Sequence, residues 1–412
     1  MINKFEYNDI LSDIIRRNKK KLTSRSSLCA ASTSAMVLCI LFGVGAPVAN
    51  AQQKAEEIEE VVVTGGRSFL SESDSTAQKL TTPIAETAAG ITVYDGDFLD
   101  DLAVGSLSEA VDYVPGVTAY SSGHSGSYFF VARGFGVSSR NGIRVNGAPI
   151  GDDFFFDDVA WDRMEYVKGA QSAAYGEVSA GGFVNIAMKE AADDFVGNVQ
   201  LSFDSFNNLQ SEITVGGPLT SSGNVRGLVA YSQANGQEFY DGGNTGSEAI
   251  YGNLVVDFSD RLTGKFYAYH EEASSLINSG LPLGEDLTDP LNPVYSVVSY
   301  DEDFFASGDF SNQATRLSFA QATLEFQIMD SLSLHGIYSV IEGKQTREDM
   351  EPAAFAYGDY VDLTPGSLTF GDVGLDVFST DRDVETNYGE IRLQGDTDIG
   401  PNATMDFYVS AE

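Results

Sequence analysis

The sequence predicts a mostly β protein, in which a small α+β domain precedes an antiparallel β-barrel that crosses a membrane. The 412 residues include 42 Gly, 26 Phe and 19 Tyr but one Trp, a mixture that favours strands and turns. Short apolar–polar alternations recur after residue 193, and no later segment has the 18 or so consecutive apolar residues of a spanning helix. The formal net charge of −36 excludes nucleic acid as a partner, because phosphate binding needs clustered Lys and Arg.

Residues 1–51 have the pattern of a secretory signal peptide. Seven basic residues precede an apolar stretch from Ala35 to Val48, which ends at the small residues Ala49-Asn50-Ala51. A transmembrane anchor is the alternative, but it needs about 20 apolar residues. Both cysteines, Cys29 and Cys39, lie in this segment, so the rest of the chain is expected to have neither a disulfide framework nor thiolate chemistry.

Residues 193–412 read as a series of membrane-crossing strands. The first, 195–203, alternates apolar and polar positions and is followed by a partner strand through Ile213 and Val215. Seven further candidates follow, at 225–231, 250–258, 262–270, 322–328, 332–340, 388–393 and 405–409. Single-chain bacterial barrels use even strand numbers, and an open edge leaves backbone groups unpaired in lipid. About nine strands are therefore expected to be only the first part of a larger barrel.

The connections between these strands alternate in length. Short turns are predicted at 217–224, 259–261, 329–331 and 398–402, and long connections at 235–248, 273–313 and 343–383. Short turns on one side and long loops on the other are typical of outer-membrane barrels. A soluble β-sandwich has the same alternation, but loops of about 40 residues are uncommon in such a domain.

The region between the signal peptide and the first strand divides into a linker, 52–77, and a Gly-rich domain, 78–192. It contains an ordered series of motifs: Ile58-Glu-Glu-Val-Val-Val-Thr-Gly65, Ser106-Leu-Ser-Glu-Ala-Val-Asp-Tyr-Val-Pro-Gly116, Val131-Ala-Arg-Gly-Phe135, Asn141-Gly-Ile-Arg-Val-Asn-Gly147, Arg163-Met-Glu-Tyr-Val-Lys-Gly169, Ala174-Tyr-Gly176 and Gly181-Gly-Phe-Val-Asn-Ile186. The first resembles a TonB box, and the others resemble the plug domain of TonB-dependent outer-membrane receptors, most closely the ferric-siderophore group. One departure is Ala170, where the family usually has proline.

This resemblance implies a plug domain inside a 22-stranded barrel in the outer membrane of a Gram-negative bacterium, surrounded by lipid and lipopolysaccharide. It also implies energy supplied by TonB, working with ExbB and ExbD. The predicted TonB-binding residues are Ile58, Glu59, Glu60, Val61, Val62, Val63 and Thr64, which could add as a strand to a periplasmic partner. An ordinary acidic linker with a valine run is the alternative. About 25 residues separate the cleavage site from the plug, too few for an additional signalling domain, so we expect a transporter and not a signal transducer.

The predicted cargo is a ferric siderophore. Between Thr118 and Gly151 the charged residues are all arginines, interspersed with aromatic residues, which suits an anionic aromatic chelate. The candidate ligand-binding residues are Tyr120, His124, Tyr128, Arg140 and, in a second loop predicted to be exposed, Phe154, Phe155 and Phe156. Alternatively, the phenylalanines belong to the plug core and the arginines face barrel carboxylates. Arg133 and Lys168 are candidates for ion pairs between plug and barrel, with solvated side chains or pairs within the plug as the alternative.

No catalytic or resident metal site is predicted. The three histidines, at 124, 270 and 335, lack paired-ligand spacing, and the Asp residues around 152–158 lack the order of a calcium loop. Gly123-His-Ser-Gly126 only approaches a nucleophile elbow; Ser125→Ala would test the remaining possibility of an esterase. We therefore expect no cofactor, iron being part of the cargo. The alternatives are the same architecture with an oligosaccharide or cobalamin as cargo, and an adhesin or phage receptor, which would not need the TonB box.

Overall fold

The structure, a computed structural model, describes residues 79, 90–102, 104, 106–119, 129–151, 154, 156–203, 208–237, 244–276, 283–286, 288, 289, 292, 294–296, 299, 311–352, 360–362, 375–400 and 403–411. All of them belong to one compact unit, Arg67–Glu412. The predicted signal peptide and TonB box lie outside the described residues.

The plug domain is built on a five-stranded sheet in the order β1-β7-β8-β5-β6, in which β5 and β8 are parallel and the other neighbours antiparallel. The strands are β1 (Gly90–Asp95), β5 (Ile143–Val145), β6 (Ala148–Pro149), β7 (Trp161–Lys168) and β8 (Gly182–Met188). A second sheet joins β2 (Val117–Ala119), β3 (Phe129–Ala132) and β4 (Phe135–Ser138). Short helices complete the domain: α2 (Gly96–Asp101), α3 (Leu107–Asp112), α4 (Ser139–Gly142), α5 (Ser172–Tyr175) and η2 (Asp158–Ala160). Every residue of β8 is buried, which makes this strand the centre of the plug.

Several residues of the plug motifs lie at positions where the local backbone requires that type of residue. Ser106 caps α3, because its Oγ accepts a hydrogen bond from Glu109 N at 3.3 Å. Asn146 and Gly147, both with positive φ, form the two-residue turn between β5 and β6. At Gly182, where φ is +108°, a Cβ would lie 1.9 Å from the carbonyl oxygen of Val167 on β7. Only glycine allows β7 and β8 to pair at this point.

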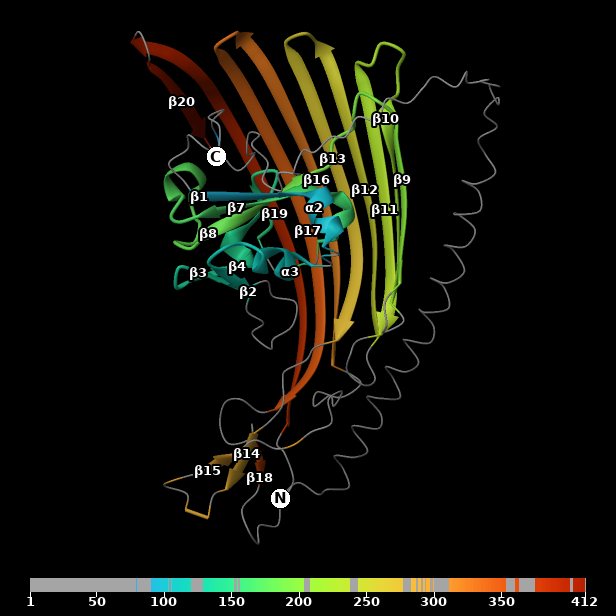
Figure 1. Ribbon diagram of the computed structural model, residues 1–412, viewed down its shortest axis with the longest axis vertical. Coiled ribbons are helices and arrows are strands. Elements are labelled where there is room, and N and C mark those ends of the chain that lie inside the picture. Colours follow the sequence, from blue (N-terminus) through green and yellow to red (C-terminus); the bar gives the residue numbers. More distant parts are fainter. Residues whose placement is uncertain are drawn as a thin grey trace, which may run out of the picture. The chain divides into compact units, whose positions relative to one another are not determined.

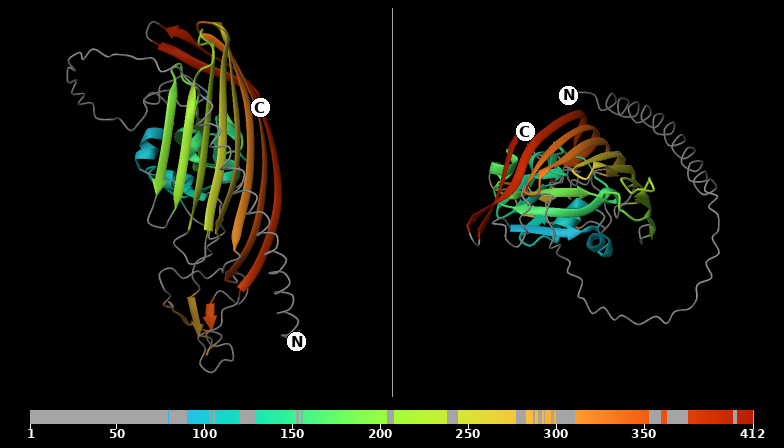
Figure 2. Two further views of the ribbon diagram at one scale, coloured as in Figure 1. Left: turned by 90° about the vertical axis from the view of Figure 1, so that its right-hand side faces the viewer. Right: turned by 90° about the horizontal axis from the view of Figure 1, so that it is seen from above.

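Nine long antiparallel strands form one sheet, which we call the wall. In sequence order they are β9 (Val196–Phe203), β10 (Leu209–Pro218), β11 (Val225–Gln237), β12 (Asn244–Ser259), β13 (Leu262–Leu276), β16 (Asn312–Met329), β17 (Leu332–Pro352), β19 (Leu375–Gly400) and β20 (Ala403–Ala411). Each pairs with its predecessor in this series (Figure 1). The sheet curves, and the plug lies on its concave side (Figure 2). Between β13 and β19, the short strands β14 (Leu283–Asp286), β15 (Val294–Ser296) and β18 (Tyr360–Asp362) form a separate small sheet.

The two faces of the wall differ in their surroundings. On the concave face, Ala230, Tyr251, Tyr269, Phe319 and Ile341 are partners in register across five successive strands, and all are buried. We call them the apolar row. On the opposite face large apolar side chains are exposed: Val229, Ile250, Leu254, Phe266, Leu324, Tyr338 and Ile391. An outward apolar surface on strands of this length is typical of a lipid-facing barrel wall.

The predicted strand number and short turns are confirmed. The short turns leave only residues 219–224, 260–261, 330–331 and 401–402 between strands. The predicted long connection at 235–248 is wrong, because β11 and β12 extend into it and leave only 238–243 between them. The connection predicted at 343–383 is likewise shortened by the ends of β17 and β19. Separately, no helix among the described residues is long and apolar enough to span a membrane.

Candidate functional site

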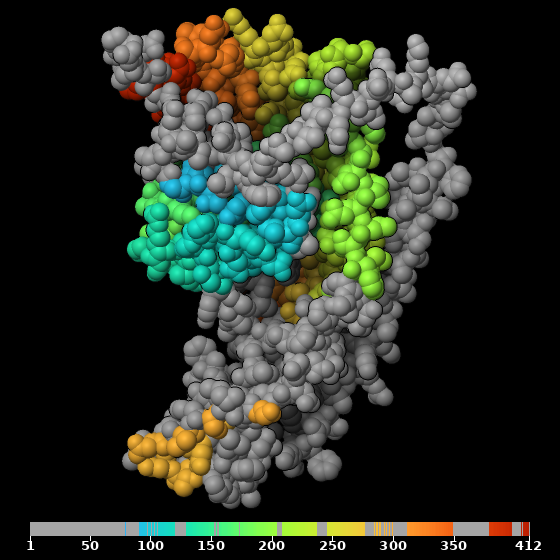
Figure 3. All heavy atoms as spheres, viewed as in Figure 1, coloured from blue at the N-terminus to red at the C-terminus, as the bar shows by residue number. Residues whose placement is uncertain are grey.

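The contacts between the plug and the wall form the candidate functional site, which we call the plug seat. In the space-filling view the atoms of the plug, blue to teal, lie in front of the strands, which are visible above and below them (Figure 3). Buried apolar residues of the plug and of the wall belong to one continuous cluster. The plug is therefore packed against the wall as part of the same hydrophobic core.

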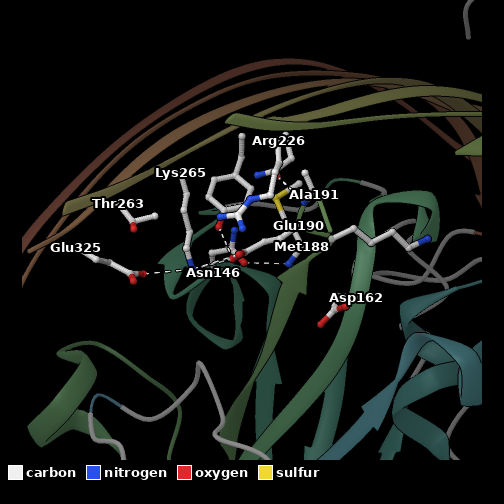
Figure 4. A network of polar contacts seen from close by, with 12 residues as sticks. Asn146, Asp162, Met188, Glu190, Ala191, Arg226, Thr263, Lys265 and Glu325 are labelled. Atoms are coloured by element: carbon white, nitrogen blue, oxygen red, sulfur yellow. Dashed lines mark hydrogen bonds and ion pairs between the residues drawn. The ribbon is translucent and has the colours of Figure 1, made fainter. Parts of the chain in front are cut away.

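One polar anchor of the plug seat follows β8, where the chain leaves the plug (Figure 4). Glu190 accepts a hydrogen bond from the hydroxyl of Tyr267 at 2.8 Å and pairs with Lys265 Nζ at 3.2 Å. Lys265 also pairs with Glu325 of β16 at 3.3 Å. The backbone of Ala191 donates to Asn253 Oδ1 at 2.9 Å. These contacts hold the end of the plug to β12, β13 and β16.

A second anchor lies before the plug sheet. Lys79 Nζ pairs with Glu390 of β19 at 3.3 Å, and the two side chains are 1% and 3% exposed. The same ammonium lies 4.8 Å from the centroid of the Tyr175 ring, where a cation–π attraction adds to the ion pair. Glu390 also accepts hydrogen bonds from Tyr388 and Arg392. A buried charge pair of this kind is weakly stabilising as a pair but costly to break on one side.

A third contact joins the loop before η2 to the apolar row. The backbone N–H of Asp157 donates to the Tyr269 hydroxyl at 2.8 Å, and that hydroxyl donates to Glu271 at 2.6 Å. Phe156 packs against the Tyr269 ring, with centroids 4.5 Å apart. Burial raises the pKa of Asp157 above its ordinary value of 3.8, and the Val159 N–H, the Ser232 hydroxyl of β11 and the charge of Lys189 oppose the shift. An acid thus lies buried where plug and wall meet.

Inside the plug, a buried polar network ties the motif residues together. Glu165 accepts hydrogen bonds from Arg163 at 2.9 Å and from Asn185 at 3.0 Å. The Arg144 guanidinium donates to Gly147 O and Tyr175 O, both at 2.8 Å, and lies 4.8 Å from the Tyr175 ring centroid. Because Tyr175 also contacts Lys79, the network extends to the second anchor. Arg144 is therefore a structural residue of the plug.

The predicted exposed loop at 154–156 is corrected by the structure. Phe154 and Phe156 are 2% and 5% exposed, and Phe155 lies outside the described residues. The Phe154 ring occupies a notch in the wall at Gly343, where a Cβ would lie 2.0 Å from Phe154 Cζ. The hydrophobic effect places these rings against the apolar row, although Asp residues flank them in the sequence. Phe154 and Phe156 thus belong to the plug seat.

The other predicted site residues are placed only in part. Tyr120, His124 and Tyr128 lie outside the described residues, as does the TonB box. Arg140 is exposed on α4. Their role in ligand binding stays a prediction. Among the described residues no group of three or more His, Cys, Asp or Glu could hold a metal ion.

Arg133 and Lys168 lie side by side at one end of the plug sheets. Arg133 is exposed, with φ +53° in the turn between β3 and β4, and burial and the charge of Arg133 lower the pKa of Lys168. No ion pair joins either residue to a barrel residue within the described ranges. The described ion pairs between plug and wall use Lys79 and Glu190 instead, which sequence reasoning missed. The charge of Glu190 immediately after the buried strand β8 was the available signal.

Comparisons with known proteins agree with this architecture. Residues 83–183 match the family model of the TonB-dependent receptor plug domain. The chain is 27% identical over 352 residues to the ferric-pyoverdine M114 receptor of a Pseudomonas species, covering 80% of this chain and 40% of the relative. It is 31% identical over 192 residues to the ferripyoverdine receptor of Pseudomonas aeruginosa, covering 45% and 23%.

Solved structures share the fold. The pyoverdine outer-membrane receptor of Pseudomonas aeruginosa bound to pyoverdine superposes with a TM-score of 0.71 at 22% identity, covering 83% of this chain and 48% of that one. The ferric-catecholate import receptor of Escherichia coli in its open form gives a TM-score of 0.69 at 15% identity, covering 81% and 50%. The chain thus spans less than half the length of the curated relatives it matches.

Proposed function

We propose that this chain, a member of the TonB-dependent receptors of the Gram-negative outer membrane, binds ferric siderophores and takes part in their active import. The observation that carries the proposal is a plug domain of this family seated by buried contacts on the concave face of nine barrel strands. A plug held in this way closes a wide barrel. Import then requires the plug to rearrange, and the energy for that has to reach it from a partner.

The cargo is inferred from the relatives. Four of them are ferric-pyoverdine receptors, and another, 26% identical over 312 residues, is the ferrioxamine B receptor of Salmonella typhimurium. A vitamin B12 transporter of Vibrio vulnificus also matches, at 26% identity over 202 residues, which keeps cobalamin as the second candidate. Iron would travel as part of the siderophore, and we propose no resident cofactor and no catalysis.

The partners follow from the same proposal. TonB would bind the segment 58–64, and ExbB and ExbD would energise TonB. The outward apolar side chains of the wall would contact outer-membrane lipid and lipopolysaccharide. Ligand binding on the side of the long connections would favour one plug state over another, which is the condition for ligand-dependent engagement of TonB.

Growth under iron limitation tests the cargo. A strain that lacks its other siderophore receptors is supplied with purified ferric chelates, with and without the gene for this protein. Growth on a ferric siderophore that depends on the gene, together with expression repressed by iron, is the expected result. Expression that does not change with the iron concentration, but increases when a glycan or cobalamin is supplied, would contradict the siderophore assignment and favour the alternative cargo.

A further inference from the structure

The outward side chains of the wall change from apolar to polar at one level. On β16 and β17 the apolar run ends, toward the long connections, at Ala320 and Val340, which are partners in register. The next two outward rows contain polar and charged side chains: Ser318, Glu342 and Glu385, followed by Arg316, Lys344 and Asp383. In an outer-membrane barrel such a change marks the level at which lipid hydrocarbon ends and headgroups begin.

A pocket of about 480 Å³ lies at this level. Its lining consists of the six side chains of the two polar rows together with Gly343 and Val384. Alternation along the strands places the six side chains on the outer face, whereas Gly343 receives the Phe154 ring on the inner face. The pocket therefore lies on the lipid side of the wall, and its volume is in the range of sites for small ligands.

Two cations in the pocket lie opposite each other. Arg316 and Lys344 are partners in register, a position in which like charges repel. Each is held by a carboxylate on the side away from the other: Arg316 Nε donates to Glu272 of β13 at 2.7 Å, and Lys344 Nζ pairs with Asp381 of β19 at 2.9 Å. The two cations are 59% and 44% exposed, and ion pairs at such positions are weak. A phosphate between the two cations would remove their repulsion without breaking a strong contact.

Two carboxylates repeat this arrangement in the adjoining row. Glu342 of β17 and Glu385 of β19 are partners in register, and Asp383 adds a third carboxylate to the lining. With two cations and three carboxylates, the lining has a formal net charge of −1, which disfavours a purely anionic ligand. It suits a ligand in which a phosphate is joined to a positive group. Since neighbouring strands lie about 5 Å apart, a two-carbon linker can place the phosphate beside the cations and an ammonium beside the carboxylates.

We propose that this pocket binds the phosphoethanolamine headgroup of an outer-membrane lipid, with Arg316 and Lys344 donating to the phosphate and with Glu342 and Glu385 accepting from the ammonium. Hydrogen bonds of this charge-assisted kind are short and strong. The Ser318 hydroxyl, which lies 2.9 Å from His270 Nδ1, is a further polar group beside the phosphate. The bound lipid holds β16, β17 and β19 at the level of the headgroups. The location of the pocket in a membrane rests on the proposed function, whereas its charge pattern does not.

Lipid binding to the purified protein tests the site. The protein is extracted from outer membranes in detergent, without a ferric chelate. Its complexes with phosphatidylethanolamine and with phosphatidylglycerol are then measured by native mass spectrometry at equal lipid concentrations. We expect phosphatidylethanolamine to bind at least about tenfold more tightly, a difference of about 1.4 kcal/mol. Equal binding of the two lipids would overturn the proposal.

Single substitutions locate the binding. Lys344→Gln removes a contact to the phosphate and should weaken binding of both lipids severalfold, whereas Glu342→Gln removes a contact to the ammonium and should weaken only phosphatidylethanolamine. Arg261→Gln is the control, because Arg261 is exposed in the turn between β12 and β13, on the side of the short turns. Unchanged unfolding in urea shows that each variant folds. Equal effects of Lys344→Gln and Arg261→Gln would refute the site.

A phosphate bridged by a divalent cation is the competing occupant, because carboxylates and phosphate oxygens together can bind Mg²⁺. This occupant would make phosphatidylglycerol or lipopolysaccharide bind more tightly than phosphatidylethanolamine, and EDTA would release it. Such a result would overturn the assignment of an ammonium to Glu342 and Glu385.

These outcomes are separable from the proposed function. Headgroup binding is measured with no siderophore present, so a preference for phosphatidylethanolamine can be found even when no siderophore supports growth. Conversely, siderophore-dependent growth with a protein that has no headgroup preference would leave the import function standing and remove the lipid site.

Discussion

At the scale of single residues, the plug seat depends on a few buried charges. The side chains of the ion pair between Lys79 and Glu390 are almost completely excluded from solvent. Substituting either residue therefore changes the energy of the charge on the other. Removing the carboxylate leaves the Lys79 ammonium buried beside the Tyr175 ring without its partner on the wall. The energetic consequence includes the cost of a buried charge that has lost this partner, which can exceed the attraction within the pair.

We predict that Glu390→Gln weakens seating of the plug by about 3 kcal/mol. The measurement is the urea concentration at which the plug becomes sensitive to protease in outer membranes. Glu272→Gln is the matched control, because Glu272 pairs with Arg316 on the outer face of the wall with both side chains about half exposed, where such pairs contribute about 0–1 kcal/mol. Equal shifts for the two variants would contradict the importance of the buried anchor.

The buried carboxyl of Asp157 should make plug seating depend on pH. Its pKa in the folded protein is raised by burial above the ordinary value of 3.8, so the folded state holds its proton more tightly than the unfolded state does. The contribution of Asp157 to the stability of the folded protein is complete below pH 3.8, and it is lost as the pH rises through the raised pKa. The groups that face this carboxyl are the Val159 N–H, the Ser232 hydroxyl of β11 and Lys189, with Glu271 reached through Tyr269.

Asp157→Asn should remove this part of the pH dependence. The amide keeps an oxygen for the Val159 N–H but cannot titrate. We therefore expect the urea midpoint for plug protection to fall less steeply in the variant than in the unsubstituted protein as pH rises from about 4 toward neutral. Parallel curves for the two proteins would place the titrating group elsewhere.

Residues that meet across long sequence separations were the hardest to predict. Motifs identified the plug because each local turn requires particular residue types. Gly182 and the turn at Asn146 and Gly147 are examples. The pairing of Lys79 with Glu390 instead depends on the register of the whole wall, which no local pattern encodes. The same reason explains Phe154 and Phe156. Flanking acidic residues indicated exposure, while their partners on the wall, Gly343 and Tyr269, lie more than about 100 residues further along the chain.

At the scale of the strands, alternation separates a lipid-facing surface from a plug-facing one. Leu324 of β16 is 47% exposed on the outer face, whereas Gln321 of the same strand is buried on the inner face. Apolar alternation was sufficient to predict all nine strands. It underestimated their length, because the added ends of β11, β12 and β17 carry mostly polar side chains and so lack the apolar signal.

A charge on the outer face tests this assignment. We predict that Leu324→Arg destabilises the barrel by about 2–4 kcal/mol, the cost of arginine near the middle of a bilayer. Gln327→Arg, which alternation places on the inner face of the same strand, away from lipid, should cost less. The yield of folded protein in the outer membrane and its unfolding in urea are the measurements. Equal tolerance of both substitutions would mean that Leu324 does not contact lipid.

At the scale of the whole molecule, binding and import should be separable. The plug seat lies within the described residues, whereas the segment 58–64 precedes them all. We predict that deletion of 58–64 leaves binding of the ferric siderophore intact and abolishes uptake, because the strand that TonB would add is missing. Radioactive iron bound to cells and iron accumulated in the cytoplasm are measured in parallel. A deletion of equal length at 68–74 in the linker is the control, and full uptake by the 58–64 deletion would refute TonB binding there.

The apolar row also limits where the chain can change in length. Five strands each contribute one side chain to the apolar row, and the register of strand pairing fixes which residue that is. One added residue between a turn and this row would exchange the inner and outer positions along the remainder of that strand, and would turn Tyr269 or Phe319 toward lipid. Epitope tags and other insertions should therefore be accepted in the exposed turn at Ser221 and Ser222, and single-residue insertions within β12, β13 or β16 should prevent assembly.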